Sequence, residues 1–122
     1  MQVDKKEEIK RYKNTHRQMG VFAIENTSDH KVLVGSSKDL VAIMNRYKTE
    51  LGFGSCRNTA LQKDWNALGE DAFDFKVLEL LDPLEDPAYD PSEDLEFLEN
   101  EWIEKLDPFD DKGYNKRPQK RR

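Results

Sequence analysis

Few of the residues that cross-link a chain or anchor it in a membrane are present here. Cysteine occurs once, at Cys56, so no internal disulfide can form, and the chain suits a reducing compartment. No apolar run approaches the roughly 18 residues of a membrane span, and the first ten residues lack the apolar stretch of a signal peptide. Apolar residues make up only 36% of the 122 positions, so the core must be small. We therefore expect one cytoplasmic domain without membrane association.

Positive charge is scarce in the body of the chain. Residues 1–18 carry six bases against three acids, and residues 116–122 carry five bases and no acid, yet the whole chain has a net charge of −5. Between residues 82 and 111, thirteen acids face one base, Lys105. Proteins that bind nucleic acid usually present a basic face. The two ends can supply local basic charge, whereas the acidic segment 82–111 is a candidate surface for a protein partner.

Apolar periodicity predicts six elements. Strand-forming residues at 21–25 and 31–34 flank a polar turn and indicate a hairpin, and residues 73–80 alternate like a third strand. Apolar residues at helical spacing predict three helices, one following Ser36 or Ser37 as its cap, one opening at Thr59, and one opening after Asp90. The predicted fold is an α/β sandwich of order β-β-α-α-β-α, with a three-stranded antiparallel sheet flanked by helices.

Several short motifs follow one another in a fixed order. They are Gly20-Val21-Phe22, Leu33-Val34-Gly35 with the run GSSKDL, the stretch 61–79, ENEWI at 99–103, and Gly113-Tyr114-Asn115. As an ordered set they resemble the GIY-YIG nuclease family. The resemblance covers residues 19–115, so we expect a GIY-YIG-like domain there. Residues 1–18 then form a polar helical extension, and residues 116–122 a basic disordered tail.

The resemblance implies hydrolysis of a DNA phosphodiester with one divalent cation, Mg²⁺ or Mn²⁺. In this family two tyrosines organise the attacking water, an arginine steadies charge on the phosphate, and a glutamate on the last long helix binds the metal. Carried over by position, the metal ligand is Glu99. The residues at three further motif positions, Gly20, Gly35 and Asn115, match the family pattern.

The remaining catalytic positions depart from the family pattern. Phe22 and Leu33 stand where the two tyrosines belong, and Ile43 stands where the arginine belongs. Loss of a positioned base typically costs ~10²–10⁴ in rate, and loss of one stabilising donor roughly 10²–10³. The sequence therefore predicts a site that is catalytically impaired or inactive.

Arg46 and Tyr47 are the nearest substitutes for the missing groups. Each also has a plainer interpretation, Arg46 as a solvated surface residue and Tyr47 as a half-buried core residue. Glu99 lies near the apolar side of its helix, where a carboxylate needs a partner. That partner is either a metal ion or an arginine, Arg46 or Arg57, and the sequence favours neither.

Two functions remain open at this stage. One is a binding module without hydrolysis, whose partner is DNA or a protein. The other is an active, divalent-metal-dependent DNA endonuclease that uses Glu99. Nucleic-acid contacts would come from the two basic ends of the chain or from basic residues of the first two helices, namely Lys38, Lys48, Arg57 and Lys63.

Overall fold

The structure is a computed structural model that describes residues 18–82 and 88–116. Its sheet contains β1 (Met19–Asn26), β2 (Val32–Ser37) and β3 (Phe73–Leu81), with β1 in the centre and both neighbours antiparallel to it. The helices are α2 (Leu40–Phe53), α3 (Thr59–Leu68) and α4 (Ser92–Leu106), with short 3-10 turns η1 (Glu70–Ala72) and η2 (Asp110–Lys112). The predicted element order and the antiparallel sheet are confirmed.

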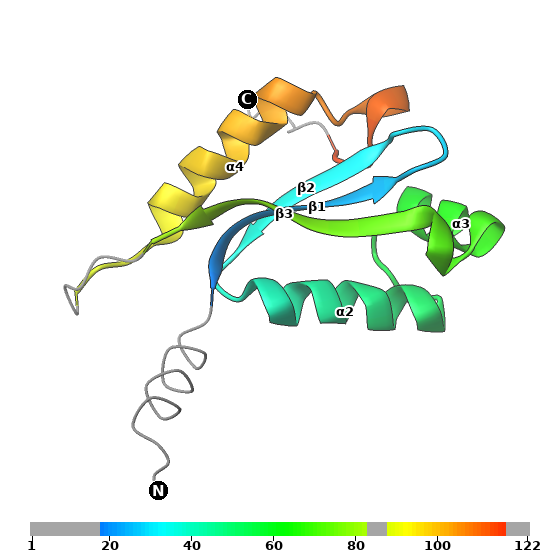
Figure 1. Cartoon of the computed structure of the whole chain (residues 1–122), viewed down its shortest axis with the longest axis horizontal. Coiled ribbons are helices and arrows are strands. Elements are labelled where there is room, and N and C mark those ends of the chain that lie inside the picture. Colours follow the sequence, from blue (N-terminus) through cyan, green and yellow to red (C-terminus); the bar gives the residue numbers. More distant parts are fainter. Residues whose placement is uncertain (1–17, 83–87, 117–122) are drawn as a thin grey trace, which may run out of the picture.

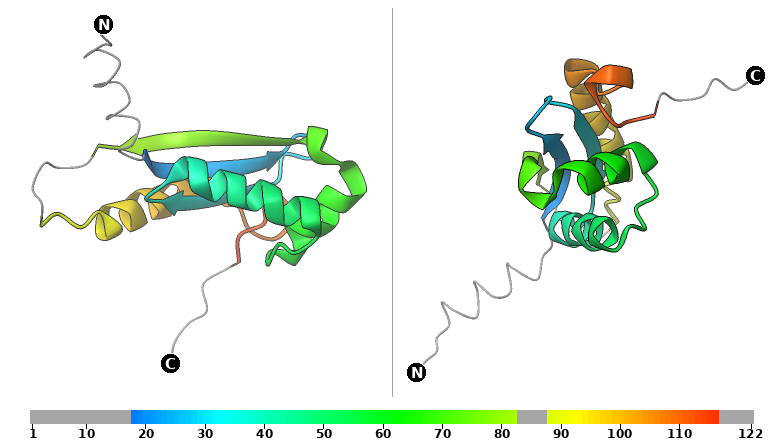
Figure 2. Two further views of the ribbon diagram at one scale, coloured as in Figure 1. Left: turned by 90° about the horizontal axis from the view of Figure 1, so that it is seen from below. Right: turned by 90° about the vertical axis from the view of Figure 1, so that its right-hand side faces the viewer.

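The sheet lies between two helical layers. Figure 1 shows α4 on one side of the strands and α2 with α3 on the other, and the right-hand view of Figure 2 shows the sheet between them. The main core fills the space between the sheet and α2 and α3. Its buried members include Ile24 from β1, Leu40 and Leu51 from α2, and Leu61 from α3. The described part of the chain contains no helix that is long and apolar enough to cross a membrane.

The helix starts differ from the sequence-based expectation. Asp39, not Ser36 or Ser37, caps α2, because its extended backbone lets its side chain accept a hydrogen bond from the Ala42 amide at 3.1 Å. Asn58 caps α3 by accepting from the Leu61 amide at 3.1 Å, so Thr59 is already the first helical residue. Asp39 and Asn58 are each the last residue with extended backbone before their helix.

The closing segment Gly113-Tyr114-Asn115 covers the free edge of β2. The Tyr114 amide donates to the Val32 carbonyl at 2.8 Å. The Asn115 side chain then accepts from the Val34 amide at 2.8 Å and donates to the Val34 carbonyl at 2.9 Å. An edge strand leaves backbone donors and acceptors unpaired, and these contacts satisfy part of that edge.

The expected helix at 1–18 and the expected tail at 116–122 lie almost wholly outside the described residues. So does the middle of the acidic connection between β3 and α4. The division of the chain into extension, domain and tail stays a prediction.

Candidate functional site

The hairpin places the two tyrosine-equivalent positions on one face of the sheet. Phe22 pairs with Gly35 and Ile24 pairs with Leu33, so Phe22 and Leu33 both point to the side of α2 and α3. Phe22 is 2% exposed and Leu33 is 7% exposed, within one apolar cluster. Neither position presents a hydroxyl, and neither side chain reaches solvent.

Two of the motif glycines are needed for close packing. A Cβ atom at Gly35 would lie 2.9 Å from ring atoms of Phe22, which covers this glycine. A Cβ atom at Gly20 would lie 2.0 Å from the backbone oxygen of Glu79 on β3, and Gly20 also has a φ of +156°. Both glycines therefore allow close packing within the sheet.

A shallow hollow of about 180 Å³ opens beside this cluster. It is lined by Ile43, Arg46, Tyr47 and Glu50 of α2 and by Arg57 and Asn58, which precede α3. Ile43 packs against the core cluster, so the arginine-equivalent position contributes an apolar side chain. The structure therefore gathers Arg46, Tyr47 and Arg57 at one place, next to Ile43.

Arg46 is tied to its own helix. Its Nε donates to Oε2 of Glu50 at 3.0 Å, one turn further along α2. The side chain remains 64% exposed, so this pair is a weak one that a phosphate can compete with. Arg57 is exposed and makes no ion pair within the residues that the structure describes.

Tyr47 brings a hydroxyl to the edge of the hollow. Its ring packs against Phe22, with ring centroids 5.9 Å apart. Burial raises the pKa of the Tyr47 hydroxyl above its ordinary value, and nearby groups that include Glu50 and Glu99 add to the rise. At neutral pH this hydroxyl is therefore protonated and suits a hydrogen-bond donor better than a general base.

Glu99 projects from α4 towards the C-terminal end of β2. Its Oε1 accepts a hydrogen bond from Oγ of Ser36 at 2.6 Å, and its side chain is half-buried. The expected arginine partner is not found, because Arg46 pairs with Glu50 instead. Sequence reasoning missed the Ser36 contact, since it joins residues 63 positions apart and depends on how α4 docks on β2.

The donor set around Glu99 suits a hard cation in chemical type. A carboxylate and a hydroxyl offer oxygen ligands, and Mg²⁺ commonly uses one or two carboxylates while keeping several waters and substrate phosphates. The described residues contain no cluster of three or more His, Cys, Asp or Glu side chains that could hold a metal ion. A cation at Glu99 would thus depend on water and on the substrate for most of its ligands.

Residues 113–115 attach the end of the domain to β2 and to neighbouring elements. Both polar atoms of the Asn115 side chain are used on Val34, as described above. The buried Tyr114 hydroxyl accepts from Asn26 at 3.1 Å and donates to Asp64 at 2.7 Å. A Cβ atom at Gly113 would lie 2.4 Å from the Pro108 backbone, so only glycine fits there. In this structure the closing motif has a structural role.

The four basic residues expected to contact nucleic acid have different surroundings. Lys38, before α2, approaches Asp90 at 3.7 Å, and Lys48 lies over the ring of Phe75 at 5.0 Å. Lys63 is exposed on α3. Of the four basic residues predicted for this role, only Arg57 lines the hollow beside Tyr47.

Comparison with solved structures identifies the fold. The catalytic domain of the homing endonuclease I-TevI superimposes with a TM-score of 0.64 and 32% sequence identity, over 80% of this chain and 96% of that one. A variant of the catalytic domain of intron endonuclease I-TevI, with one glutamate replaced by alanine, gives a TM-score of 0.66 and 28% identity, over 80% and 92% of the two chains. The I-TevI catalytic domain is a GIY-YIG nuclease domain.

The chain belongs to the GIY-YIG nuclease family. No model of a protein family matches it, and neither does any curated protein, so the assignment rests on the shared structure and sequence identity with I-TevI. GIY-YIG nucleases generally depend on a divalent metal ion. Phe22, Leu33 and Ile43 are the residues at the positions where the polar groups of the family motif are expected from the sequence.

Proposed function

We propose that this GIY-YIG domain binds DNA and hydrolyses it very weakly or not at all. The observation that carries the proposal is the filling of the family's catalytic positions by apolar side chains. Phe22 and Leu33 are buried, and Ile43 packs on the same cluster. These three side chains themselves offer neither a hydroxyl nor a guanidinium to a water molecule.

The remaining polar groups support binding better than catalysis. Tyr47 keeps its proton at neutral pH for the reasons given above, so it offers a donor to a phosphate oxygen. Arg57 and Arg46 bring positive charge to the same hollow. Contacts between arginines and phosphates give affinity without demanding sequence recognition. DNA is the partner suggested by the homing-endonuclease neighbours.

A second candidate is an active endonuclease, favoured by one observation. Glu99 is retained, half-buried, and oriented by the Ser36 hydroxyl, as a metal-binding carboxylate would be. A cation bound there would polarise the phosphate and lower the pKa of a bound water. Glu99 and Ser36 would hold the ion, while Tyr47 would donate to the phosphate.

Two assays on the full chain separate these functions. Fluorescence anisotropy of a labelled DNA duplex measures binding, and nicking of supercoiled plasmid with Mg²⁺ or Mn²⁺ measures hydrolysis. Glu99→Gln, which keeps the shape and the contact with Ser36, is the matched control. We expect salt-dependent binding, with nicking no faster than in Glu99→Gln.

Each alternative result has a clear meaning. Nicking that disappears in Glu99→Gln would establish the active endonuclease and overturn the proposed impairment. Absence of binding at low salt, in a protein that is folded by circular dichroism, would overturn the DNA-binding role.

A further inference from the structure

A larger cleft lies on the other face of the sheet, under the C-terminal half of α4. Ala23 and Glu25 line it, and they alternate along β1 with Phe22 and Ile24 of the main core. The cleft has a volume of about 470 Å³, within the range of pockets that take a ligand or a large side chain. Much of its wall is apolar, formed by Leu78 of β3 and by Trp102 and Leu106 of α4.

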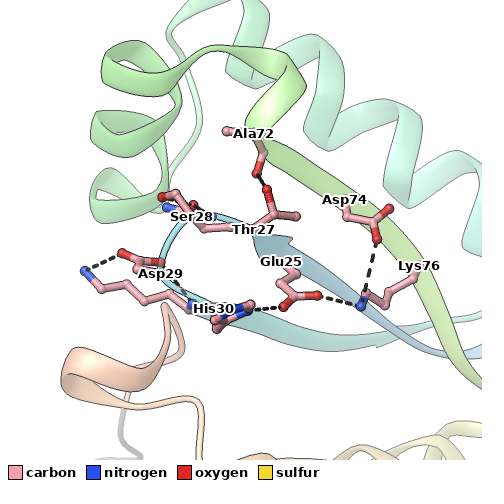
Figure 3. A network of polar contacts seen from close by, with 10 residues as sticks. Glu25, Thr27, Ser28, Asp29, His30, Ala72, Asp74 and Lys76 are labelled. Carbon is pink, nitrogen blue, oxygen red and sulfur yellow. Dashed lines mark hydrogen bonds and ion pairs between the residues drawn. The ribbon is translucent and has the colours of Figure 1, made fainter.

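Part of the polar edge of this cleft, around Glu25, is already satisfied. Oε1 of Glu25 lies 2.6 Å from Nζ of Lys76, and its Oε2 lies 3.0 Å from Nδ1 of His30. Figure 3 shows Glu25 held between these two side chains. The paired charges need no counter-ion from a ligand. Binding in this cleft would therefore draw mainly on its apolar walls.

A second hollow shares the side chain of Trp102 with the first. It has a volume of about 200 Å³ and is lined by Glu79, Glu101, Trp102, Glu104 and Lys105. Trp102 borders both hollows, and its Nε1 donates to Glu79 at 2.8 Å. Three carboxylates beside an aromatic ring form surroundings that attract a cation.

The chain itself shows that an ammonium group fits there. Nζ of Lys105 lies 4.7 Å from the centre of the Trp102 ring. Lys105 is the one basic residue of α4, against six acidic residues on the same helix. Negative charge therefore remains in excess around this hollow after Lys105 has been counted.

We propose that the two hollows form one docking groove for a basic peptide segment of a partner protein. A large apolar side chain of that segment fills the 470 Å³ cleft, and a neighbouring lysine or arginine enters the hollow lined by Glu79, Glu101 and Glu104. Charge complementarity selects a basic peptide over DNA, because phosphates would face carboxylates here. The groove and the candidate DNA site lie on opposite faces of the sheet, so both can be occupied together.

The test uses the full chain labelled with ¹⁵N and a short synthetic peptide with one leucine flanked by lysines. The sequence has two tryptophans, Trp65 and Trp102, so two indole N–H signals report on two separate places. Trp102→Phe assigns the signals. We expect the peptide to shift the Trp102 signal and leave the Trp65 signal in place. A peptide with serine for leucine, and another with glutamate for lysine, should shift neither.

Variants of the groove check where the peptide binds. Leu106→Ser should weaken binding about tenfold or more, since it removes an apolar wall. Glu101→Gln and Glu104→Gln should each weaken it about two- to fivefold, the usual effect of an exposed ion pair. Glu93→Gln, an exposed residue in the first turn of α4, should leave the affinity unchanged.

Several results would overturn the proposal. One is an unmoved Trp102 signal at millimolar peptide, and another is an equal shift with the serine peptide. A shift produced by duplex DNA would make this face a nucleic-acid surface. A shift that grows with protein concentration alone, together with a heavier species in sedimentation, would make it an interface between two copies of the chain.

Discussion

Arg57 and Arg46 line the same hollow but differ in their ion pairs. Arg46 shares its charge with Glu50, whereas Arg57 has no ion-pair partner among the described residues. Removing one phosphate contact lowers the slope of log affinity against log salt by about 0.9. We therefore expect Arg57→Ala to reduce the slope by close to that amount and Arg46→Ala to reduce it less. Anisotropy titrations at a series of KCl concentrations measure both slopes.

Lys105→Ala on the opposite face serves as the matched control for these two variants. Lys105→Ala removes one positive charge but does not alter the hollow beside Tyr47. The slope of log affinity against log salt should therefore equal that of the unmodified chain. An unchanged slope in Arg57→Ala would mean that DNA approaches another face.

Asn115 attaches the C-terminal segment of the domain to the edge of β2 through two hydrogen bonds to Val34. Asn115→Ala removes both hydrogen bonds to Val34, and we expect it to lower the free energy of unfolding by about 1–3 kcal/mol. Asn115→Asp keeps the acceptor but loses the donor, so it should also destabilise. Urea denaturation measures each variant, with Asn45→Ala on the exposed side of α2 as the control. Equal midpoints for Asn115→Ala and the unmodified chain would rule out the structural role.

At the scale of elements, Glu25 and Lys76 join the central strand to β3. The hydrogen bond from Lys76, followed by that from His30, lowers the pKa of Glu25. Because the pKa of Glu25 is lower in the folded chain than in the unfolded chain, its hydrogen bonds contribute stability in full only above the pKa of the unfolded chain. That stability is lost as pH falls through the folded value. The chain should therefore lose part of its stability as the pH falls below about 4.5, the ordinary pKa of a glutamate, at which it is half-protonated in the unfolded chain.

Glu25→Gln isolates this contribution. We expect it to cost about 1 kcal/mol at pH 7, because one partner remains partly exposed, and to cost progressively less as the pH falls towards 3. Urea midpoints at a series of pH values give the comparison, and Glu96→Gln on α4 serves as an exposed control. A difference that stays constant across the pH range would contradict the assignment.

The order of the elements and the hairpin of β1 and β2 could be predicted because each element buries one face with regular spacing. Leu40, Leu51 and Leu61 are buried as helical periodicity required. The starts of the helices could not be predicted to the residue. Asp39 follows two serines that are equally good caps, and the choice among them depends on the backbone angles of the loop.

The positions assigned to the candidate site stay a prediction, and the contacts of those residues could not be predicted from the sequence. Phe22 and Leu33 could be placed from the order of the motifs, and the register of the hairpin brings them to one face. The pair formed by Ser36 and Glu99 depends on the docking of α4 and has no local signal. The pair formed by Arg46 and Glu50 did have one, the spacing of four residues along a helix.

At the scale of the whole molecule, charge is divided between an acidic body and basic ends. Residues 116–122 contain five bases, and residues 1–17 have a net charge of +3. If the hollow between α2 and α3 binds DNA, a chain that ends at Asn115 should retain salt-dependent affinity with a smaller slope. A chain that lacks residues 1–17 is the comparison, and anisotropy measures both. Complete loss of affinity in the first truncation would assign binding to the tail alone.

If the domain is impaired as we propose, the ring of Phe22 over Gly35 also bears on how easily mutation could restore the family's chemistry. A hydroxyl added at position 22 would enter a site that is 2% exposed, at a cost of roughly 1–3 kcal/mol unless it found a partner. A tyrosine at position 33 and an arginine at position 43 would each disturb the same apolar cluster. None of these changes alone assembles a working site, because such groups act as a unit. Each single mutation at these positions is therefore expected to lower the stability of the domain without a matching gain in activity.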